Sequence, residues 1–547
     1  MPARIILLSG PISAGKSALA TRLVDRYGAE QIKTKDLLRA RFPKLGDTRG
    51  ALQSAGRRLD AETSEAWVAD GVLAVSAATS AKNVVVDAVR TMGQLDACRK
   101  AFGPRLAHIH LTADRDLLAN RYLHRKGPVV EFADYDRARR DSVERRVDEL
   151  GAVADIRVDT GSSTEDDVLV RAAAQLGFYG RSYARLVDVL IGGQWGSEGK
   201  GHIASYLAPE YQYLVRVGGP NAGHKVFEPS GAFTFHQLPS GSRNSEARLL
   251  IAPGAVLWAT SLIEEINKCE LEVGRLAIDP KAMIINEGDR RFEIDTLQKW
   301  IASTAQGVGA ASARRLMRGA LGTGLRKPRA LAPVALAGNI PELKPWLADT
   351  REILDDAFQQ RAIVFVEGTQ GAGLSLYHGD FPHVTSRDTG VAGCLSEAGI
   401  APSRLRRIVM VVRSYPIRVQ DPDTAGHTSG AMGREIDWDV VAERSGIPLE
   451  ELQSHERTST TNRKRRVAEF NWWLLRRSAS INGPTDIALS FADYLSVENR
   501  TAQRFEQLTA ETIMFVEEIE RVTAAPVSLI STRFDFPYRS IIDRRAW

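Results

Sequence analysis

The segment "LVDVLIGGQWGSEGKGHIASYLA", residues 186–208, decides how most of this chain folds. An apolar run, a glycine-rich turn and a helical pattern follow one another, which predicts a strand, a loop and a helix. This arrangement presents backbone N–H groups and a helix N-terminus to a phosphate group. Lys200 suits phosphate binding, but Ser197 stands where a metal-dependent phosphoryl transfer would be better served by a carboxylate. A functional interpretation therefore has to explain the hydroxyl at position 197.

The composition favours a multidomain protein that binds small anionic molecules. The chain has 547 residues, enough for two or three domains with sizeable cores. Its 72 Lys and Arg residues against 67 Asp and Glu residues give a net charge of +5. Such mild basicity favours anionic small molecules over nucleic acid as partners.

The cysteines and the apolar runs indicate a soluble cytoplasmic protein. Cys98, Cys269 and Cys394 are far apart, form no CxxC motif and leave one cysteine unpaired. This usage is typical of a reducing compartment without structural zinc. No apolar run reaches about 18 residues, and the one at the N-terminus is too short for a signal peptide. We expect no membrane partner.

Strand-like and helix-like segments alternate along the chain, which predicts an α/β fold of βαβ units and parallel sheets covered by helices. The strand-like runs include "RIILLSG" (4–10), "NVVVDAV" (83–89), "LAHIHLT" (106–112), "YLVRVGG" (213–219), "RAIVFVEG" (361–368) and "RIVMVVRSYPIRV" (407–419). The pattern restarts at residue 187, which places a boundary near residues 178–186. We expect one domain in residues 1–180 and a second in residues 186–547.

The N-terminal domain carries a P-loop. "GPISAGKS" matches GxxxxGK[ST] between a strand-like run and a helical pattern, with Gly10 and Gly15 wrapping the β-phosphate. Lys16 neutralises phosphate charge, and the Ser17 hydroxyl is a Mg²⁺ ligand. Asp87 ends a strand-like run and is a second candidate for the Mg²⁺ site, although it equally well terminates the strand.

Three arginines of "ADRDLLANRYLHRKG" suggest a lid that clamps phosphates, or else a solvated basic face. They are Arg115, Arg121 and Arg125. With the P-loop, these features resemble the nucleoside and deoxynucleoside monophosphate kinase branch of P-loop proteins, over roughly residues 1–180. The resemblance rests mainly on the P-loop and leaves the phosphate acceptor open.

A sharper resemblance covers residues 186–547. Several motifs follow in order: "GGQWGSEGKG", "VRVGGPNAGHKV", "HQLPSG", "STAQGVGAA", "FVEGTQGAGLSLYHGDFPHVTS", "TTNRKRR" and "PVSLIST". They resemble the adenylosuccinate synthetase family, which implies an α/β domain with a large central sheet. In that family a nucleoside triphosphate phosphorylates the purine 6-oxygen, and the amine of aspartate then displaces the phosphate. The implied cofactors are Mg²⁺ and, as cosubstrate, ATP or GTP.

The residues at these motifs suit that chemistry. His224 can donate a proton or hydrogen bond to the 6-oxygen, while Asn221 and Gly223 approach the substrate phosphate or the metal. Arg463 and Arg465 in a polar loop can pair with the two carboxylates of aspartate. Catalytic roles are expected for Ser197, His224 and Lys200. The expected nucleotide-binding residues are Asn221, Ser303, Thr304, Arg318, Gln370, Thr385 and Arg463; aspartate would meet Thr460, Thr461, Arg463 and Arg465. The expected triphosphate site is Gly196, Glu198, Gly199, Lys200, Gly201, Phe491, Asp493 and Ser531; the metal ligands are Ser17, Asp87 and Gly223.

The chain departs from the family pattern in both base-reading regions. Ser197 stands in place of the aspartate that removes the purine N1 proton and ligates Mg²⁺. Phe491 replaces the lysine before Asp493, which reads guanine of GTP in the family, and "STRFDF" lacks the usual glycine-proline. We therefore expect an apolar ring at residue 491 to stack on any purine, so that adenine triphosphates serve at least as well as GTP.

Ser197 points to a guanine nucleotide as substrate. A carboxylate beside N1 would crowd a 2-amino group, whereas a hydroxyl leaves room and can accept a hydrogen bond from that amine. The phage branch of the family, the 2-aminoadenylosuccinate synthetases that use dGMP, looks like this at the same position. The alternatives are adenylosuccinate synthesis from IMP and an inactive nucleotide-binding domain that regulates the kinase-like domain.

Two further expectations concern assembly and pathway. In the family the arginine that corresponds to Arg318 reaches the substrate phosphate of the neighbouring subunit, which implies a homodimer. The fusion of a P-loop kinase-like domain to a ligase suggests that both act on purine nucleotides of one pathway.

Overall fold

A computed structural model describes residues 2–46, 48–124, 134–139, 146–179, 184–229, 231–318, 334–423, 425–457, 463–535 and 537–546. The chain divides into two compact units, Met1–Arg181 and Ser182–Trp547. Each unit contains its own sheet and its own apolar core, as the α/β pattern of the sequence predicts.

Unit 1 is built on a parallel sheet of five strands in the order β2-β3-β1-β4-β5. The strands are β1 (Arg4–Ser9), β2 (Glu30–Ile32), β3 (Asn83–Val86), β4 (Leu106–Thr112) and β5 (Ile156–Asp159). The helices are α1 (Lys16–Tyr27), α2 (Thr34–Arg41), α3 (Arg49–Thr63), α4 (Trp67–Ala78), α5 (Met92–Phe102), α6 (Arg115–Leu123), α7 (Tyr135–Arg139) and α9 (Glu165–Gln175).

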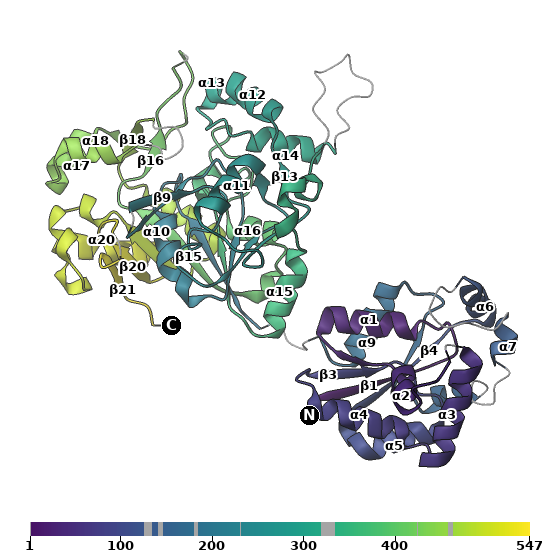
Figure 1. Cartoon of the computed structure of the whole chain (residues 1–547). Coiled ribbons are helices and arrows are strands. Elements are labelled where there is room, and N and C mark those ends of the chain that lie inside the picture. Colours follow the sequence, from purple (N-terminus) through teal and green to yellow (C-terminus); the bar gives the residue numbers. More distant parts are fainter. Residues whose placement is uncertain are drawn as a thin grey trace, which may run out of the picture. The chain divides into compact units, whose positions relative to one another are not determined.

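Alternate residues of β1 enter two different cores, because successive side chains of a strand point to opposite faces of the sheet. Ile6 and Leu8 pack with residues of α1 and α9. Ile5 and Leu7 pack with residues of α4 and α5. Figure 1 shows α1 and α9 on one side of β1 and β3 and α4 and α5 on the other. The P-loop follows β1 and therefore lies at the carboxyl edge of this sheet, where nucleotides bind in such folds.

Unit 2 is built on a sheet of nine strands in the order β12-β10-β7-β14-β6-β15-β19-β20-β21, parallel except for β21. The strands are β6 (Val187–Gly192), β7 (Tyr213–Arg216), β10 (Arg248–Ile251), β12 (Leu276–Ile278), β14 (Val364–Glu367), β15 (Leu405–Arg413), β19 (Asp486–Ser490), β20 (Val527–Ser531) and β21 (Ile541–Asp543). All six residues of β6 are buried, as expected of a central parallel strand. The large central sheet implied by the family resemblance is confirmed.

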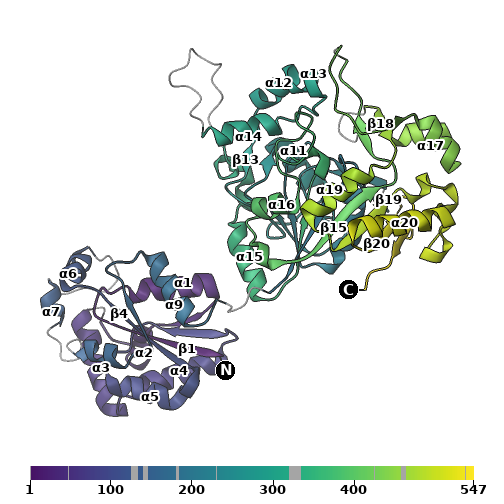
Figure 2. The same ribbon diagram turned by 180° about the vertical axis from the view of Figure 1, so that it is seen from behind.

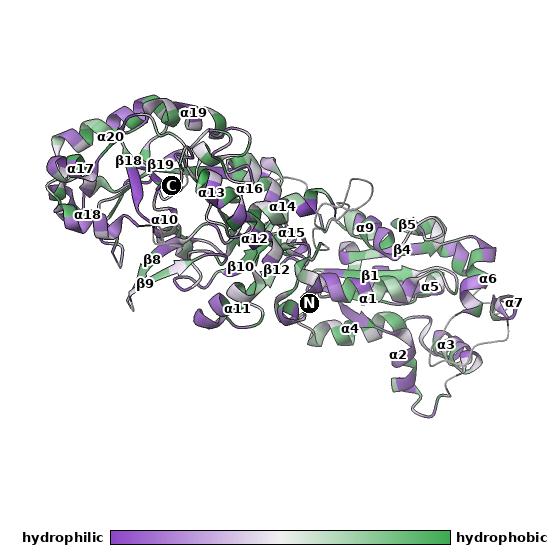
Figure 3. Cartoon of the chain, turned by 90° about the horizontal axis from the view of Figure 1, so that it is seen from above, coloured by the Kyte–Doolittle hydropathy of each residue, from purple (hydrophilic) through white to green (hydrophobic). Residues whose placement is uncertain are grey.

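Helices cover both faces of this sheet. They are α10 (Lys200–Leu207), α11 (Ala259–Lys268), α12 (Glu287–Asp295), α13 (Leu297–Ile301), α14 (Val308–Leu316), α15 (Thr350–Gln359), α16 (Val391–Ala398), α17 (Trp438–Ser445), α18 (Leu449–His455), α19 (Trp472–Asn482) and α20 (Ala510–Thr523). Residues of α15, α16, α19 and α20 pack on one face, and residues of α10 and α11 on the other. Figure 2 shows α16 and α19 in front of the strands that α10 overlies in Figure 1. Hydrophilic and hydrophobic residues alternate along the helices (Figure 3), as expected of helices that bury one apolar face.

Smaller sheets accompany the large sheet of unit 2. They pair β8 (His224–Glu228) with β9 (Gly231–Phe235), β11 (Val256–Leu257) with β13 (Met283–Ile284), and β16 (Ile417–Val419) with β18 (Arg465–Ala468) and β17 (Glu435–Ile436). The run at 407–419, predicted as one strand, is thus two strands in different sheets. Pro416 lies between them and has no N–H to donate to a ladder, which is a physical reason for the break. Among the described residues, no helix combines the length and apolarity that a membrane crossing requires.

Candidate functional site

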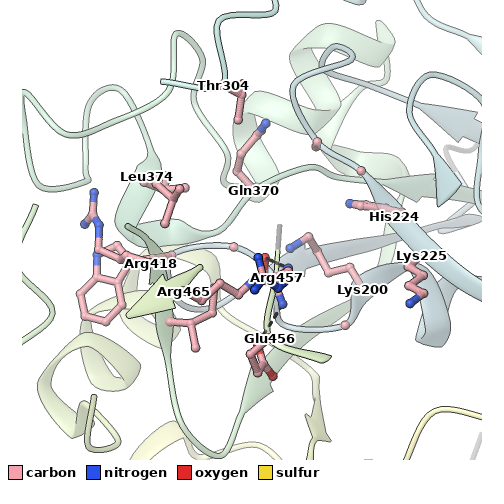
Figure 4. A pocket seen from close by; sticks show the side chains of 18 of the residues that line it. Lys200, His224, Lys225, Thr304, Gln370, Leu374, Arg418, Glu456, Arg457 and Arg465 are labelled. Atoms are coloured by element: carbon pink, nitrogen blue, oxygen red, sulfur yellow. Dashed lines mark hydrogen bonds and ion pairs between the residues drawn. The ribbon is translucent and has the colours of Figure 1, made fainter. Parts of the chain in front are cut away.

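A cavity of about 960 Å³ opens in unit 2 beside the glycine-rich loop that follows β6. Figure 4 shows Lys200 and His224 on one side of it, Thr304 and Gln370 on another, and Glu456, Arg457 and Arg465 grouped on a third. Many residues that the sequence singles out line it: Gly196, Ser197, Gly199, Lys200, Gly201, Asn221, Gly223, His224, Ser303, Thr304, Gln370, Thr385, Arg465, Phe491 and Asp493.

The glycine-rich loop is held by Glu198. Its buried carboxylate accepts hydrogen bonds from the backbone N–H groups of Gln194 at 3.1 Å and Gly196 at 2.8 Å, and contacts the ammonium of Lys200. Gly199 has φ 85° and precedes α10, and a Cβ atom there would lie 2.8 Å from Phe534. Lys200 thus has a carboxylate partner before any phosphate binds, and Glu198, predicted in the triphosphate site, lies behind the lining instead.

Ser197 is exposed to the cavity and has φ 55°, in the left-handed region. Its hydroxyl accepts a hydrogen bond from Nη2 of Arg465 at 3.3 Å. Its carbonyl accepts one from Nη1 of Arg413 at 3.2 Å. Position 197 is therefore joined to the loop that the sequence links to aspartate binding.

Glu456 holds the two arginines that reach Ser197. Its carboxylate accepts hydrogen bonds from Arg413 at 2.8 Å, Arg465 at 2.9 Å and the Tyr494 hydroxyl at 2.9 Å. Burial alone would raise the pKa of Glu456, but the two guanidinium groups hold it at about 2. Arg465 is thereby oriented toward the cavity. Arg463 is partly buried and lies outside the lining, and Thr460 and Thr461 lie outside the described residues.

His224 belongs to a buried cluster with Arg216 and Glu367. Its Nδ1 lies 2.5 Å from Oε1 of Glu367 and 2.7 Å from Nη1 of Arg216. Burial and then Arg216 lower the pKa of His224 to about 3. Burial raises the pKa of Glu367, but Arg216 and the contacts with His224 and Ser240 hold it at about 2. These contacts use Nδ1, which leaves Nε2 for the cavity. With so low a pKa the ring is neutral, and Nε2 carries the proton in the tautomer whose Nδ1 accepts from Arg216.

The residues predicted to hold the nucleotide monophosphate converge only in part. The amide of Gln370 donates to Asn221 at 3.1 Å, and the amide of Asn221 donates to the Thr385 hydroxyl at 3.3 Å. Ser303 and Thr304 line the same cavity from the segment between α13 and α14. Arg318 follows α14, is exposed and does not line the cavity of its own chain.

The second base-reading region forms an aromatic wall. The ring centroids of Phe491 and Phe534 are 4.6 Å apart, and the guanidinium of Arg413 lies 3.9 Å from the Phe491 centroid. Asp493 lies beside them, 4% exposed. Ser531 is buried and lies outside the lining, and its hydroxyl donates to the carbonyl of Arg533.

In unit 1 the P-loop lies between β1 and α1, with Gly15 in the left-handed region at φ 93°. The ammonium of Lys16 donates to the carbonyls of Gly10 at 2.6 Å and Pro11 at 2.8 Å. Ser17 is exposed in the first turn of α1.

The other candidates of unit 1 have partners within the unit. Oδ1 of Asp87 accepts from the N–H and the hydroxyl of Thr34 at the start of α2. Arg115 pairs with Asp136, and Arg121 donates to Thr160, so the two arginines do not converge on one point. Arg125 lies outside the described residues.

Sequence reasoning missed the side chains that orient the site. Arg216 and Glu367 stand inside the quoted motifs "VRVGG" and "FVEGTQG", and Glu456 stands four residues before Thr460. A buried charge next to a glycine motif was the available signal, because charges are rarely buried unless they are paired. The described residues contain no group of three or more His, Cys, Asp or Glu side chains placed to hold a metal ion.

Comparison with known proteins gives a consistent result for both units. The adenylosuccinate synthetase family model matches residues 189–332 and 334–500, and an AAA domain model matches residues 5–150. The adenylosuccinate synthetase of Thermococcus sibiricus is 34% identical over 364 residues, which cover 65% of this chain and 98% of that protein.

Two solved structures resemble unit 2. The fully ligated adenylosuccinate synthetase of Plasmodium falciparum is 21% identical with a TM-score of 0.56, and covers 66% of this chain and 100% of its own. The succinoaminodeoxyadenylate synthetase (PurZ) of cyanophage S-2L, bound to dGMP and to dATP as an energy donor, is 25% identical with a TM-score of 0.53, and covers 66% of this chain and 96% of its own.

Proposed function

Because the chain belongs to the adenylosuccinate synthetase family, we propose that unit 2 ligates L-aspartate to the 6-position of a guanine nucleotide, dGMP or GMP, with hydrolysis of a nucleoside triphosphate. The observation that carries the proposal is Ser197, a small uncharged side chain that faces the cavity beside Arg465. A hydroxyl there leaves room for a 2-amino group and accepts a hydrogen bond from it. The phage relative bound to dGMP supports the same choice of substrate.

The cavity residues divide the reaction between them. The 6-oxygen attacks the γ-phosphorus, a bond forms between them, and the nucleoside diphosphate leaves. His224 donates from Nε2 to the 6-oxygen as its charge changes, and Lys200 neutralises phosphate charge. The aspartate amine then attacks C6, the C6–O bond breaks with loss of phosphate, and a proton of the amine passes to that phosphate. Arg465, with Arg463, binds the carboxylates of aspartate.

The N1 proton of guanine needs an acceptor other than residue 197. Glu456 is the carboxylate joined to Ser197 through Arg465, but a pKa of about 2 makes it a weak base. We therefore propose that an oxygen of the γ-phosphate accepts the N1 proton.

Mg²⁺ fits the oxygen atoms present. It prefers oxygen ligands, keeps several waters and commonly takes one or two protein ligands beside phosphate oxygens. In unit 2 the Ser197 hydroxyl and the Gly223 carbonyl are candidates at the cavity wall, and in unit 1 they are Ser17 and Asp87. When bound, the ion would neutralise the negative charge of the phosphate groups.

Unit 1 is proposed to be a phosphotransferase that acts on a purine nucleoside monophosphate of the same pathway. The P-loop between β1 and α1 supports nucleoside triphosphate binding. Its fusion to a ligase for purine nucleotides supports the choice of acceptor class.

The substrate is tested by ligation assays with dGMP, GMP and IMP, each with aspartate and ATP or GTP. We expect the succinylated product from dGMP or GMP. Ser197→Asp should lower kcat/KM for the guanine nucleotide about tenfold or more, because the carboxylate crowds the 2-amino group and also pairs with Arg465. Product from IMP alone would refute the guanine assignment.

Ser197→Ala is the matched control for that experiment. It removes the hydroxyl without crowding the base, so the expected loss is only that of one hydrogen bond, about 1 kcal/mol. Equal effects of alanine and aspartate would remove the steric argument.

We further propose a homodimer that buries the face around Arg318. Five large apolar side chains are exposed on α12–α14 and the residue after α14: Phe292, Ile294, Trp300, Leu316 and Met317. Exposed apolar groups gathered on packed helices mark an interface more often than a free surface. Arg318 follows them directly and does not reach the cavity of its own chain.

Negative charges introduced into the exposed apolar face around Arg318 should separate the subunits. The double variant Leu316→Glu, Met317→Glu is expected to sediment with the mass of one chain and to lose at least 90% of ligation, roughly the tenfold that 1.4 kcal/mol represents. Met514→Glu on α20, where the side chain is also exposed, is the control and should stay dimeric and active. A fully active monomer would contradict the proposal.

A further inference from the structure

Arg500 occupies one oxygen of the Asp493 carboxylate, in the part of the cavity proposed to bind the nucleoside triphosphate. Nε of Arg500 donates to Oδ2 of Asp493 at 3.1 Å, and Nη2 donates to Glu451 at 2.6 Å. All three side chains line the cavity, close to the aromatic wall of Phe491 and Phe534. Motif patterns did not predict a cation here, because Arg500 lies in none of the family motifs of the chain.

The other oxygen of Asp493 is a buried acceptor. Oδ1 has no hydrogen-bond partner, and the residue is 4% exposed. A buried acceptor left unpaired costs about 1–3 kcal/mol. Burial raises the pKa of Asp493 to about 6 against the opposing effect of Arg500, so the carboxylate is mostly ionised at pH 7.5. A ligand that brings one N–H group to Oδ1 is therefore favoured.

The Asp493–Arg500 pair presents one hydrogen-bond acceptor, Oδ1 of Asp493, beside the N–H donors of the Arg500 guanidinium. Adenine carries an amine at position 6 next to the acceptor N1, which complements this pair. Guanine presents a carbonyl at position 6, and its adjacent N1–H and 2-amino donors need two carboxylate oxygens for a bidentate contact. Since Arg500 holds Oδ2, guanine would lose one of those two hydrogen bonds.

We propose that Arg500 is a specificity-determining residue of the donor site, and that by occupying Oδ2 of Asp493 it makes this site select a 6-aminopurine triphosphate, ATP or dATP, over GTP. This inference rests on the proposed ligase function of unit 2. It goes beyond the replacement at Phe491, because an apolar ring stacks on any purine, whereas the Asp493–Arg500 pair reads the base edge.

The test measures kcat/KM for ATP and for GTP as donors, with the succinylated nucleotide as readout, because unit 1 does not form that product. Wild-type full-length protein should prefer ATP. Arg500→Met frees both oxygens of Asp493 for guanine, so the ATP/GTP ratio should move toward GTP by about tenfold or more, the effect of one regained hydrogen bond to a charged group. Arg500→Lys keeps a cation on Oδ2 and should retain the preference for ATP.

Arg521→Met, an exposed arginine on α20, is the matched control and should leave the ratio unchanged. Arg500→Gln replaces the methionine variant if that protein does not fold. A ratio that stays within twofold of wild type in the neutral variants, or a wild-type preference for GTP, overturns the inference while the ligase function stands. Absence of succinylated product from every nucleotide and donor overturns both.

Discussion

His224→Ala is expected to lower ligation by about 10²–10⁴-fold, the range for loss of a positioned proton donor. The reason is geometric: Glu367 and Arg216 both lie at Nδ1, so the ring is oriented with Nε2 toward the cavity. Alanine removes that donor where charge changes on the 6-oxygen. The measurement is the rate of succinylated product at saturating nucleotide, donor and aspartate.

Two variants separate this role from a structural one. His224→Gln keeps an amide N–H close to the position of Nε2, so it should recover part of the rate that alanine loses. His378→Ala removes an exposed histidine from the same unit and should change neither rate nor thermal unfolding. Nearly full activity of a folded His224→Ala protein would exclude His224 from the proton-transfer step.

Sequence reasoning located the fold because its signals are local. A fully apolar run before a glycine-rich turn predicted β6, the loop and α10, and the structure places them there. The alternation of strands and helices predicted an α/β fold, which the two sheets confirm. The failure at 407–419 is also local. The residues on both sides of Pro416 are apolar, so the pattern does not mark the change from the nine-stranded sheet to the small sheet.

The orientation of individual side chains was less predictable. Glu198 and Lys200 stand in one motif, yet Lys200 faces the cavity while Glu198 turns inward to hold the loop. That difference follows from positive φ values at Gly196 and Gly199, which redirect the chain within four residues. The spacing of residues within the motif carries no information on which way each side chain points.

Ion pairs between residues that are far apart in the chain could not be predicted, for a different reason. Glu456 meets Arg413, 43 residues earlier in the chain, and Arg500 meets Glu451, 49 residues earlier. These pairs exist because β15, α18 and the segment after β19 end at the same cavity. A single sequence does not state which carboxyl ends of strands become neighbours, so the pairing of charges had to come from the structure.

The other large effect is expected in unit 1. Lys16→Ala should lower phosphoryl transfer to a purine monophosphate by about 10²-fold or more, because it removes the cation that neutralises the transferring phosphate. Ligation should stay within twofold of wild type. The two compact units have separate cores, and the Lys16 ammonium donates to the carbonyls of Gly10 and Pro11 in its own loop. Both activities are measured on the same full-length protein, by diphosphate formation and by succinylated product.

Lys44→Ala, at an exposed lysine of unit 1, controls for a general effect of charge removal and should leave both rates unchanged. If a folded Lys16→Ala protein lost ligation as well, unit 1 would act on unit 2 as a regulatory or structural partner, since proximity alone gives no such dependence. If the wild-type protein phosphorylated no purine monophosphate, the P-loop would serve another acceptor and the shared pathway would be wrong. Independent loss of the kinase activity alone is the outcome that fits two catalysts joined in one chain, each with its own phosphate loop at the carboxyl edge of its own sheet.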